Sequence, residues 1–480
     1  MHILPAVKKL KIDMGEAARE VYFDYDPTMK PEQYSIVADK TGIRVFSSDK
    51  KGKFYAKKTL EQIFYEYKDK IPCFTIEDEP KYTYRGFMMD CCRHFFTVDE
   101  IKKEIEVAAS VKMNKFHWHL TDDQGWRIEI KKYPLLTEIG SVRKQTRKDG
   151  KEVKGYYTAE EIKDIVKFCK EKFIDVIPEI DMPGHFTAAI AAYPHLGCTG
   201  EKKEVSEHFG IHCEIACAGK ETTYGFIKDV LDEVTELFPY EYIHIGGDEA
   251  LKYRYTECPD CRKKIAEENL ADEEALQGYF MNAAIDYLAG KGRKAVLWND
   301  GTLGGNVKGN YAVQYWKETK ECKNAAIAAA ESGKEIIYSP FSSLYLDYPC
   351  GMTPLKKTYN YKEEKELTDR VKGLETPVWT EFIPDIKTWE LRAYPRLFAV
   401  AERAWSEEKD YDGFLLRLDE YEKFAKENFA IKICEKPDPN RIAGLIETLK
   451  FGIKAFDPYF IEFARLTRIT KKRMNKRKNS

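Results

Sequence analysis

The sequence predicts an α/β protein: a (β/α)8 TIM barrel with a small N-terminal α+β domain and a C-terminal helical extension. Two observations support this prediction. Eight short, β-prone apolar segments follow one another along the chain, and helical segments with 3.6-residue periodicity lie between most of them. The length of 480 residues also suits one large domain plus a smaller one. We place the domains at residues 1–79, 80–406 and 407–480.

The first domain combines short strands with one helix. Its strand candidates include Tyr34–Val37 and Gly42–Phe46, and its helical segment runs from Lys57 to Tyr67. Proline after two acids favours a turn, so Asp78-Glu79-Pro80 is expected to join this domain to the barrel.

The barrel segments alternate regularly after this joint. The expected strands are Arg85–Asp90, Lys115–Thr121, Asp175–Ile180, Tyr242–Gly246, Lys294–Trp298, Ala312–Trp316, Glu335–Ser339 and Pro377–Thr380. The expected helices are Val98–Val111, Ala159–Lys172, Thr222–Leu237, Glu273–Ala289, Lys320–Ser332 and Asp385–Trp405. Residues 341–376 contain many aromatic side chains and turn-forming residues, and we expect them to form a long loop.

The last domain is predicted to be a charged helical extension from Tyr411 to about Thr470. Over the whole chain 78 basic residues face 80 acidic ones, so no global field indicates a nucleic-acid partner. Arg465 to Lys478 holds eight basic residues and no acid. We expect a solvated, frayed tail there; binding to nucleic acid or to a charged surface is the alternative.

Nothing in the sequence predicts a membrane segment, because it contains no run of 18 apolar residues. The N-terminus lacks the features of a secretory signal, and twelve cysteines without such a signal fit a reducing compartment. We therefore expect a cytoplasmic protein, with a truncated secreted form as the alternative.

A CPDC pair, Cys258 and Cys261, has the spacing of half a zinc site. A complete site needs two further ligands, and no second CxxC or matched histidine pair follows. We therefore expect no metal and no cofactor.

The most informative motif is HIGGDEA, residues 244–250. An apolar strand ends in two glycines, and two adjacent acids, Asp248 and Glu249, follow. Two carboxylates this close do not both ionise easily, so one holds its proton to higher pH. Such a pair suits the cleavage of a glycosidic bond. An isolated acid pair more often caps a helix or pairs with lysine. The residues at the other strand ends are therefore needed to choose between a catalytic and a structural role for this pair.

Catalytic groups of a TIM barrel lie at the carboxyl ends of its strands, and unusual residues gather there. Indole rings suit the apolar face of a sugar or a methyl group, while carboxylates and arginine can bond its hydroxyls. Core filling and surface ion pairs are the alternative roles. The candidates are Arg93, Asp122, His185, Trp298, Trp316, Asp347, Trp379 and Glu381. His117 and His119 could bind a metal, but we favour packing and hydrogen bonding.

Seven segments, in this order, carry a family resemblance: RGFMMDCCRHFFTVDEI, MNKFHWHLTDDQGWRIEI, IPEIDMPGH, HIGGDEA, VLWND, SLYLDY and VWTE. The chain resembles the β-N-acetylhexosaminidases of glycoside hydrolase family 20 from about Tyr84 to Ser406. The upstream segment resembles the small non-catalytic domain of that family. One departure is Cys92, where family members usually have serine before the Arg-His pair.

The resemblance implies a retaining, exo-acting enzyme whose nucleophile is the 2-acetamido group of its own substrate. It implies that Glu249 is the general acid and then the base, and that Asp248 orients the acetamido N–H and stabilises an oxazolinium intermediate. It further implies a hydrogen bond from Tyr345 to the acetamido oxygen. Trp298, Trp316 and Trp379 would enclose the methyl group, Arg93, Asp347 and Glu381 would hold sugar hydroxyls, and Asp122 and His185 would form a relay toward Glu249.

The expected partner is a β-linked N-acetylhexosamine glycan or glycoside, of gluco or galacto configuration, without nucleic-acid or membrane partners. The sequence leaves the oligomeric state undecided. One alternative is a metal-dependent hydrolase on the same barrel that uses His117, His119, His185 and Asp248 as ligands. The other alternative is a non-catalytic sugar-binding protein.

Overall fold

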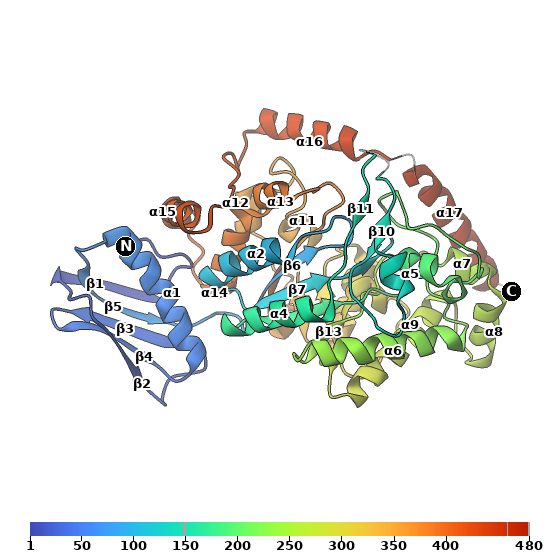
Figure 1. Cartoon of the computed structure of the whole chain (residues 1–480), viewed down its shortest axis with the longest axis horizontal. Helices are drawn as coiled ribbons and strands as arrows, with labels where there is room; N and C mark the ends of the chain where they lie inside the picture. Colours follow the sequence, from blue (N-terminus) through green and yellow to red (C-terminus); the bar gives the residue numbers. More distant parts are fainter. Residues whose placement is uncertain (147–149, 458, 479–480) are drawn as a thin grey trace.

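The computed structural model describes residues 1–146, 150–457 and 459–478 (Figure 1). Its centre is a closed barrel of eight parallel strands, in the spatial order β12-β13-β14-β15-β16-β17-β6-β7. The predicted TIM barrel is therefore confirmed. The strands are β6 (Tyr84–Asp90), β7 (Lys115–His119), β12 (Asp175–Glu179), β13 (Tyr242–His244), β14 (Lys294–Trp298), β15 (Tyr311–Tyr315), β16 (Ile336–Tyr338) and β17 (Val371–Val378).

Helices follow these strands and cover the outside of the barrel. The main ones are α2 (Val98–Ser110), α4 (Ala159–Glu171), α6 (Glu221–Leu237), α9 (Glu273–Gly290), α10 (Lys320–Glu331), α13 (Ile386–Ala393) and α14 (Arg396–Trp405). Capping boxes fix the starts of α2 and α4, where Thr97 and Thr158 each exchange hydrogen bonds with a glutamate three residues later.

Shorter elements fill the loops at the two ends of the barrel. They are β8 (Thr121–Asp122), β9 (Gly125–Trp126), α3 (Leu135–Glu138), β10 (Val142–Arg143), β11 (Val153–Lys154), α5 (Thr187–Ala192), η1 (Pro194–Leu196), α7 (Tyr253–Glu257), α8 (Pro259–Glu267), η2 (Asn299–Thr302), α11 (Phe341–Leu344), α12 (Leu355–Tyr359) and η3 (Thr368–Arg370).

The last barrel strand begins earlier than predicted. Three short helical turns and the first six of the eight residues of β17 lie within residues 341–376, so the prediction of one long loop there is wrong. The start of this strand was missed because it contains Gly373, and glycine is depleted in strands. Its presence has a packing reason: a Cβ at Gly373 would lie 1.7 Å from the carbonyl oxygen of Tyr84 on the neighbouring strand β6.

The helix expected over Asp385–Trp405 is divided into α13 and α14. Pro395 stands at the division; proline lacks an N–H and disfavours helical backbone in the residue before it. Each half keeps a buried face against the barrel.

The N-terminal domain is a five-stranded sheet of order β1-β5-β3-β4-β2 with one helix against it. Its elements are β1 (Lys9–Glu16), β2 (Val21–Tyr25), β3 (Tyr34–Asp39), β4 (Gly42–Ser47), α1 (Lys50–Tyr67) and β5 (Pro72–Asp78). A buried ion pair joins this domain to the barrel: Asp78 lies 3.0 Å from Lys112 Nζ and accepts from Trp405 Nε1 at 3.0 Å.

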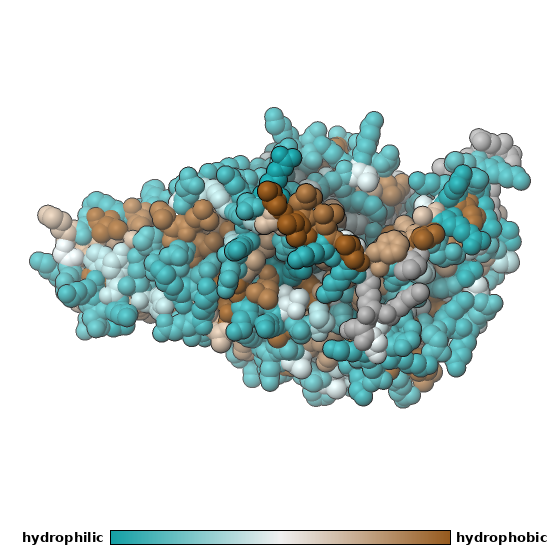
Figure 2. All heavy atoms as spheres, turned by 90° about the horizontal axis from the view of Figure 1, so that it is seen from above, coloured by the Kyte–Doolittle hydropathy of each residue, from teal (hydrophilic) through white to brown (hydrophobic). Residues whose placement is uncertain are grey.

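The C-terminal extension consists of α15 (Tyr411–Phe429), α16 (Arg441–Ala455) and α17 (Tyr459–Lys478). The expectation of a frayed basic tail is wrong, because α17 is helical to Lys478 and contacts α7. Arg473 donates a hydrogen bond to Glu257 at 2.9 Å. Figure 2 shows exposed apolar side chains across one face of the molecule, where α16 carries Ile442, Leu445, Leu449 and Ile453. Among the described residues, no helix is long and apolar enough to cross a membrane.

We expect Gly373→Ala to lower the stability of the barrel, because the added methyl group must displace backbone of β6. The free energy of unfolding should fall by about 1–3 kcal/mol, measured by urea denaturation. Gly225→Ala is the matched control, since Gly225 lies in α6 with no atom within 4 Å of its added Cβ. This control should be neutral or stabilise by up to about 1 kcal/mol. Equal effects of the two variants would contradict the packing explanation.

Candidate functional site

The two acids of the HIGGDEA motif lie where the carboxyl end of β13 opens into the mouth of the barrel. Gly246 adopts a φ of 64° and contacts Asp181 so closely that a Cβ would lie 1.7 Å from its carboxylate oxygen. Glu249 also has a left-handed backbone, with a φ of 48°. Non-glycine residues rarely adopt this conformation, and they do so preferentially at functional sites.

Three charged side chains surround Glu249. Its N–H donates to Asp300 Oδ2 at 3.1 Å, and its carboxylate lies 4.0 Å from Lys317 Nζ and 3.9 Å from His185 Nε2. Burial raises the pKa of Glu249, whereas Lys317 and His185 oppose that rise. A carboxyl group with a raised pKa can hold a proton and donate it.

Asp248 is buried beside Glu249 and offers an unused acceptor. Its Oδ1 has no hydrogen-bond partner among the described residues, while its Oδ2 lies 3.6 Å from His185 Nε2. Burial raises the pKa of Asp248 to about 7; His185 lowers it and Asp300 raises it further. A buried acceptor without a partner is costly, so this atom is suited to a donor from a bound ligand.

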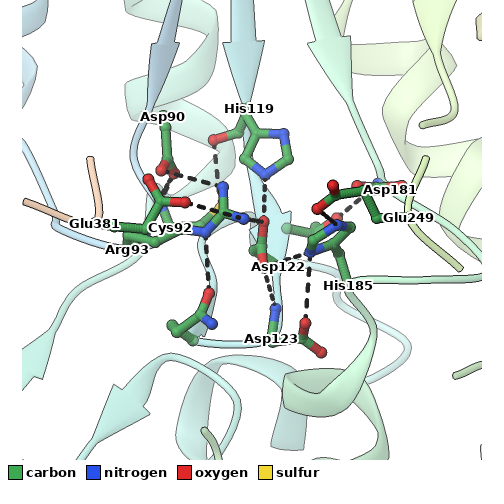
Figure 3. Close-up of polar contacts among 12 residues, drawn as sticks. Asp90, Cys92, Arg93, His119, Asp122, Asp123, Asp181, His185, Glu249 and Glu381 are labelled. Atoms are coloured by element: carbon green, nitrogen blue, oxygen red, sulfur yellow. Dashed lines mark hydrogen bonds and ion pairs between the residues drawn. The ribbon is translucent and has the colours of Figure 1, made fainter. Parts of the chain in front are cut away.

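His185 lies between Asp122 and Glu249, as Figure 3 shows. Its Nδ1 lies 3.2 Å from Asp122 Oδ1 and 3.4 Å from Asp123 Oδ2, and its Nε2 faces Asp248 and Glu249. Burial opposes its charge, but Asp122 and Asp123 raise the pKa of His185 well above the usual value. The expected neighbourhood of Asp122, His185 and Glu249 is therefore present in the structure.

Arg93 belongs to the same network and is held by three side chains. It lies 2.9 Å from Asp122 and 3.3 Å from Asp90, and its Nε donates to Gln124 at 3.0 Å. Glu381 is 3.9 Å away. The Cys92 thiol beside Arg93 donates to the His119 carbonyl at 3.3 Å.

Asp347 follows the carboxyl end of β16 and is near Glu381. Its Oδ1 is buried without a hydrogen-bond partner among the described residues. Burial and the nearby Glu381 raise the pKa of Asp347 well above its usual value. A second unused acceptor thus lies at the mouth of the barrel.

Four aromatic side chains at this end of the barrel contact one another in a closed circle. Centroid distances are 6.3 Å from Trp298 to Trp316, 5.9 Å from Trp316 to Tyr345, 6.5 Å from Tyr345 to Trp379 and 5.9 Å from Trp379 to Trp298. The structure therefore brings together all four aromatic residues that the sequence singled out. Such a cluster can enclose a small apolar group.

His117 and His119 contact buried carboxylates. His117 lies 2.7 Å from Glu375 and 3.0 Å from Glu179, and His119 contacts Glu179 and, at 2.9 Å, Asp122. These contacts give both imidazoles hydrogen-bonding partners, and the same side chains also belong to groups that could hold a metal ion, His117 with Glu179 and His244, and His119 with Asp122 and Asp181.

Sequence reasoning missed two kinds of residue. Asp300 and Lys317 were not chosen, although Asp300 lies only two residues after the tryptophan at the end of β14. Cys198 and Cys217 were also missed: they lie beside Cys258 and Cys261, so the expectation that this pair lacks two further ligands is wrong. The search covered only a second CxxC or a histidine pair, whereas these cysteines are 19 residues apart.

Comparisons with known proteins agree with this geometry. The Porphyromonas gingivalis protein "Beta-hexosaminidase" is 40% identical over 442 residues, which cover 85% of this chain and 56% of that protein. A crystal structure of a β-N-acetylhexosaminidase aligns with a TM-score of 0.86 at 30% identity and covers 91% of this chain and 97% of the other. A Vibrio harveyi exo-β-N-acetylglucosaminidase in complex with N-acetylglucosamine aligns with a TM-score of 0.80 at 28% identity, covering 90% and 78%.

Family models assign both larger domains. The model of glycosyl hydrolase family 20, domain 2, matches residues 5–79. The model of the catalytic domain of the same family matches residues 82–408, which is more than half of the chain. This protein therefore belongs to glycosyl hydrolase family 20.

Proposed function

We propose that this protein is a retaining, exo-acting β-N-acetylhexosaminidase that removes a terminal β-linked N-acetylglucosamine or N-acetylgalactosamine. The family and its named relatives support the activity. One observation supports the mechanism: a buried, unpartnered acceptor on Asp248 lies beside a protonatable Glu249 at a mouth ringed by four aromatic side chains.

Glu249 is the general acid in this proposal. Its proton goes to the glycosidic oxygen as the bond to the anomeric carbon breaks, and the resulting carboxylate then deprotonates the attacking water. Asp122 and His185 act as positioning residues: the charged imidazole, held by Asp122, faces the Glu249 carboxylate at 3.9 Å and stabilises it after proton transfer.

The acetamido group of the substrate is the nucleophile. Its carbonyl oxygen attacks the anomeric carbon as the leaving group departs, which gives an oxazolinium ion. Asp248 Oδ1 accepts the acetamido N–H and stabilises the developing positive charge; one such electrostatic contact is worth about 3–4 kcal/mol. Tyr345 donates to the carbonyl oxygen, and Trp298, Trp316 and Trp379 enclose the methyl group. Arg93, Asp347 and Glu381 bind the sugar hydroxyls.

We expect Glu249→Gln to reduce kcat by about 10²–10⁴-fold on substrates with poor leaving groups. Aryl glycosides with activated leaving groups should lose much less, because they need little help from an acid. Glu236→Gln, an exposed position in α6, is the matched control and should leave both rates unchanged. Equal losses on the two substrates would remove Glu249 from the role of general acid.

The 2-acetamido group should be required for chemistry as well as for binding. At saturating concentration, aryl glycosides with a 2-hydroxyl group should show essentially no turnover, and a thiazoline mimic of the cyclised intermediate should inhibit competitively. A glycosyl adduct on any carboxylate, detected by mass spectrometry of the trapped enzyme, would contradict the mechanism.

The pH profile should be bell-shaped in kcat/KM. Asp248 must be ionised, so activity should fall as the pH drops below its pKa of about 7. Glu249 must be protonated, so activity should fall again as the pH rises through its raised pKa. Because a donor from bound substrate favours the Asp248 carboxylate, the acid limb of kcat should lie at lower pH than that of kcat/KM. In Glu249→Gln, the residual activity on activated glycosides should lose the limb at the higher pH; a retained limb would assign it to another group.

Activity should survive dialysis against EDTA and should not increase when zinc is added. The proposed steps use carboxylates, an imidazole and the substrate itself. Loss of activity on chelation, with recovery on metal addition, would instead favour the metal-dependent hydrolase with His117, His119, His185 and Asp248 as ligands.

A further inference from the structure

We propose that Cys198, Cys217, Cys258 and Cys261 bind one Zn²⁺ in a structural site of four thiolates, outside the candidate active site. Their four sulfur atoms all lie within 4.8 Å of one another. Cys217, Cys258 and Cys261 are buried and Cys198 is partly buried. Tetrahedral sites of four cysteines are typical of structural zinc.

The distances between the sulfur atoms match those of a metal-centred tetrahedron. Zinc–sulfur bonds of about 2.3 Å in tetrahedral geometry place neighbouring sulfurs about 3.8 Å apart. Here Cys198 Sγ lies 3.8 Å from Cys261 Sγ, and Cys217 Sγ lies 3.8 Å from Cys258 Sγ and 3.7 Å from Cys261 Sγ.

Disulfide bonding describes this cluster less well. Disulfide bonds join sulfurs in pairs at about 2.05 Å, whereas Cys217 Sγ is equally close to two other sulfurs. Hydrogen bonding among four packed thiols would also explain their convergence poorly, because S–H groups are weak donors and acceptors. A common central ligand accounts for all four positions together.

Two segments of the chain build the cluster, and each is held in place by its backbone. Cys258 precedes α8 and Cys261 lies in its first turn, so the CPDC pair sits at the start of a helix. On the other segment, the Cys217 N–H donates to the Leu196 carbonyl at 2.8 Å, and Gly197 forms a β-bridge with Ala216. These contacts bring Cys198 beside Cys217 although 18 residues separate them in the sequence.

The location indicates the role of the metal. Ala216 next to Cys217 donates its N–H to the Pro183 carbonyl at 2.8 Å, two residues before His185. Its carbonyl accepts from the Tyr255 hydroxyl at 2.9 Å, in the segment that leads from Glu249 to Cys258. A zinc ion would therefore fasten the loop that carries His185 to the loop that carries Glu249.

The first experiment measures the metal content of the untagged, full-length protein, because a histidine tag would bind zinc itself. Elemental analysis should find about one zinc per chain, and the zinc should remain after dialysis of the native protein against EDTA because the site is buried. Unfolding in the presence of a colorimetric chelator should release it. Protein refolded with Co²⁺ should show the visible absorption of tetrahedral thiolate-bound cobalt.

Variants then test the ligands. Cys258→Ser and Cys217→Ser should lose the zinc and melt at a lower temperature. Cys350→Ser and Cys434→Ser are the matched controls, since these two sulfurs also lie close together, at 3.5 Å, but do not belong to the group of four cysteines. The controls should keep the full zinc content.

Three outcomes would overturn the proposal: wild-type protein without metal, iron in place of zinc, or a thiol titration of the unfolded protein that finds the four cysteines in two disulfides. The metal content of the wild-type protein tests the zinc proposal even if a ligand variant fails to fold. The proposal is independent of the hexosaminidase mechanism, which contains no metal step.

Discussion

One buried carboxylate, that of Glu179 at the end of β12, organises the mouth of the barrel. It accepts a hydrogen bond from Trp298 Nε1 at 2.7 Å and contacts the imidazoles of His117 and His119. A charge buried this deeply is tolerable only when it is paired and hydrogen-bonded. Burial alone would raise the pKa of Glu179, but the surrounding imidazoles hold it well below its usual value.

The Glu179 carboxylate connects the cluster of four aromatic side chains with the proton-transfer groups. Trp298 belongs to the ring of aromatic contacts, and His119 passes the connection to Asp122 at 2.9 Å. Arg93 and His185 lower the pKa of Asp122 despite its burial, whereas burial raises the pKa of Asp248. The barrel thus places carboxylates that stay charged near carboxylates that hold protons, which is how one site separates acid from base roles.

The sequence predicted the barrel well, because strand and helix patterns are local, and the structure brings the side chains it singled out at the strand ends close together. Strand β14 and the start of α2 were predicted to the residue, since a continuous apolar run and a capping threonine specify them. The start of β17 was not predicted, because Gly373 suits that strand only through its contact with Tyr84. Asp300, Lys317 and the cysteine cluster depend on how distant segments meet, and no local pattern reports that.

The barrel is closed by pairing between its first strand in the chain and its last, which the ribosome synthesises early and late. Strand β17 pairs with β6, and Thr380 donates to Asp90 at 3.0 Å across 290 residues. At ribosomal rates of 5–20 residues per second, roughly 15–60 s pass between the emergence of the two partners. During that interval β6 has an unpaired edge, which can template pairing with other chains. Trp379 and Glu381 directly follow the closing strand, so the nascent chain completes the candidate site only in the step that also removes this hazard.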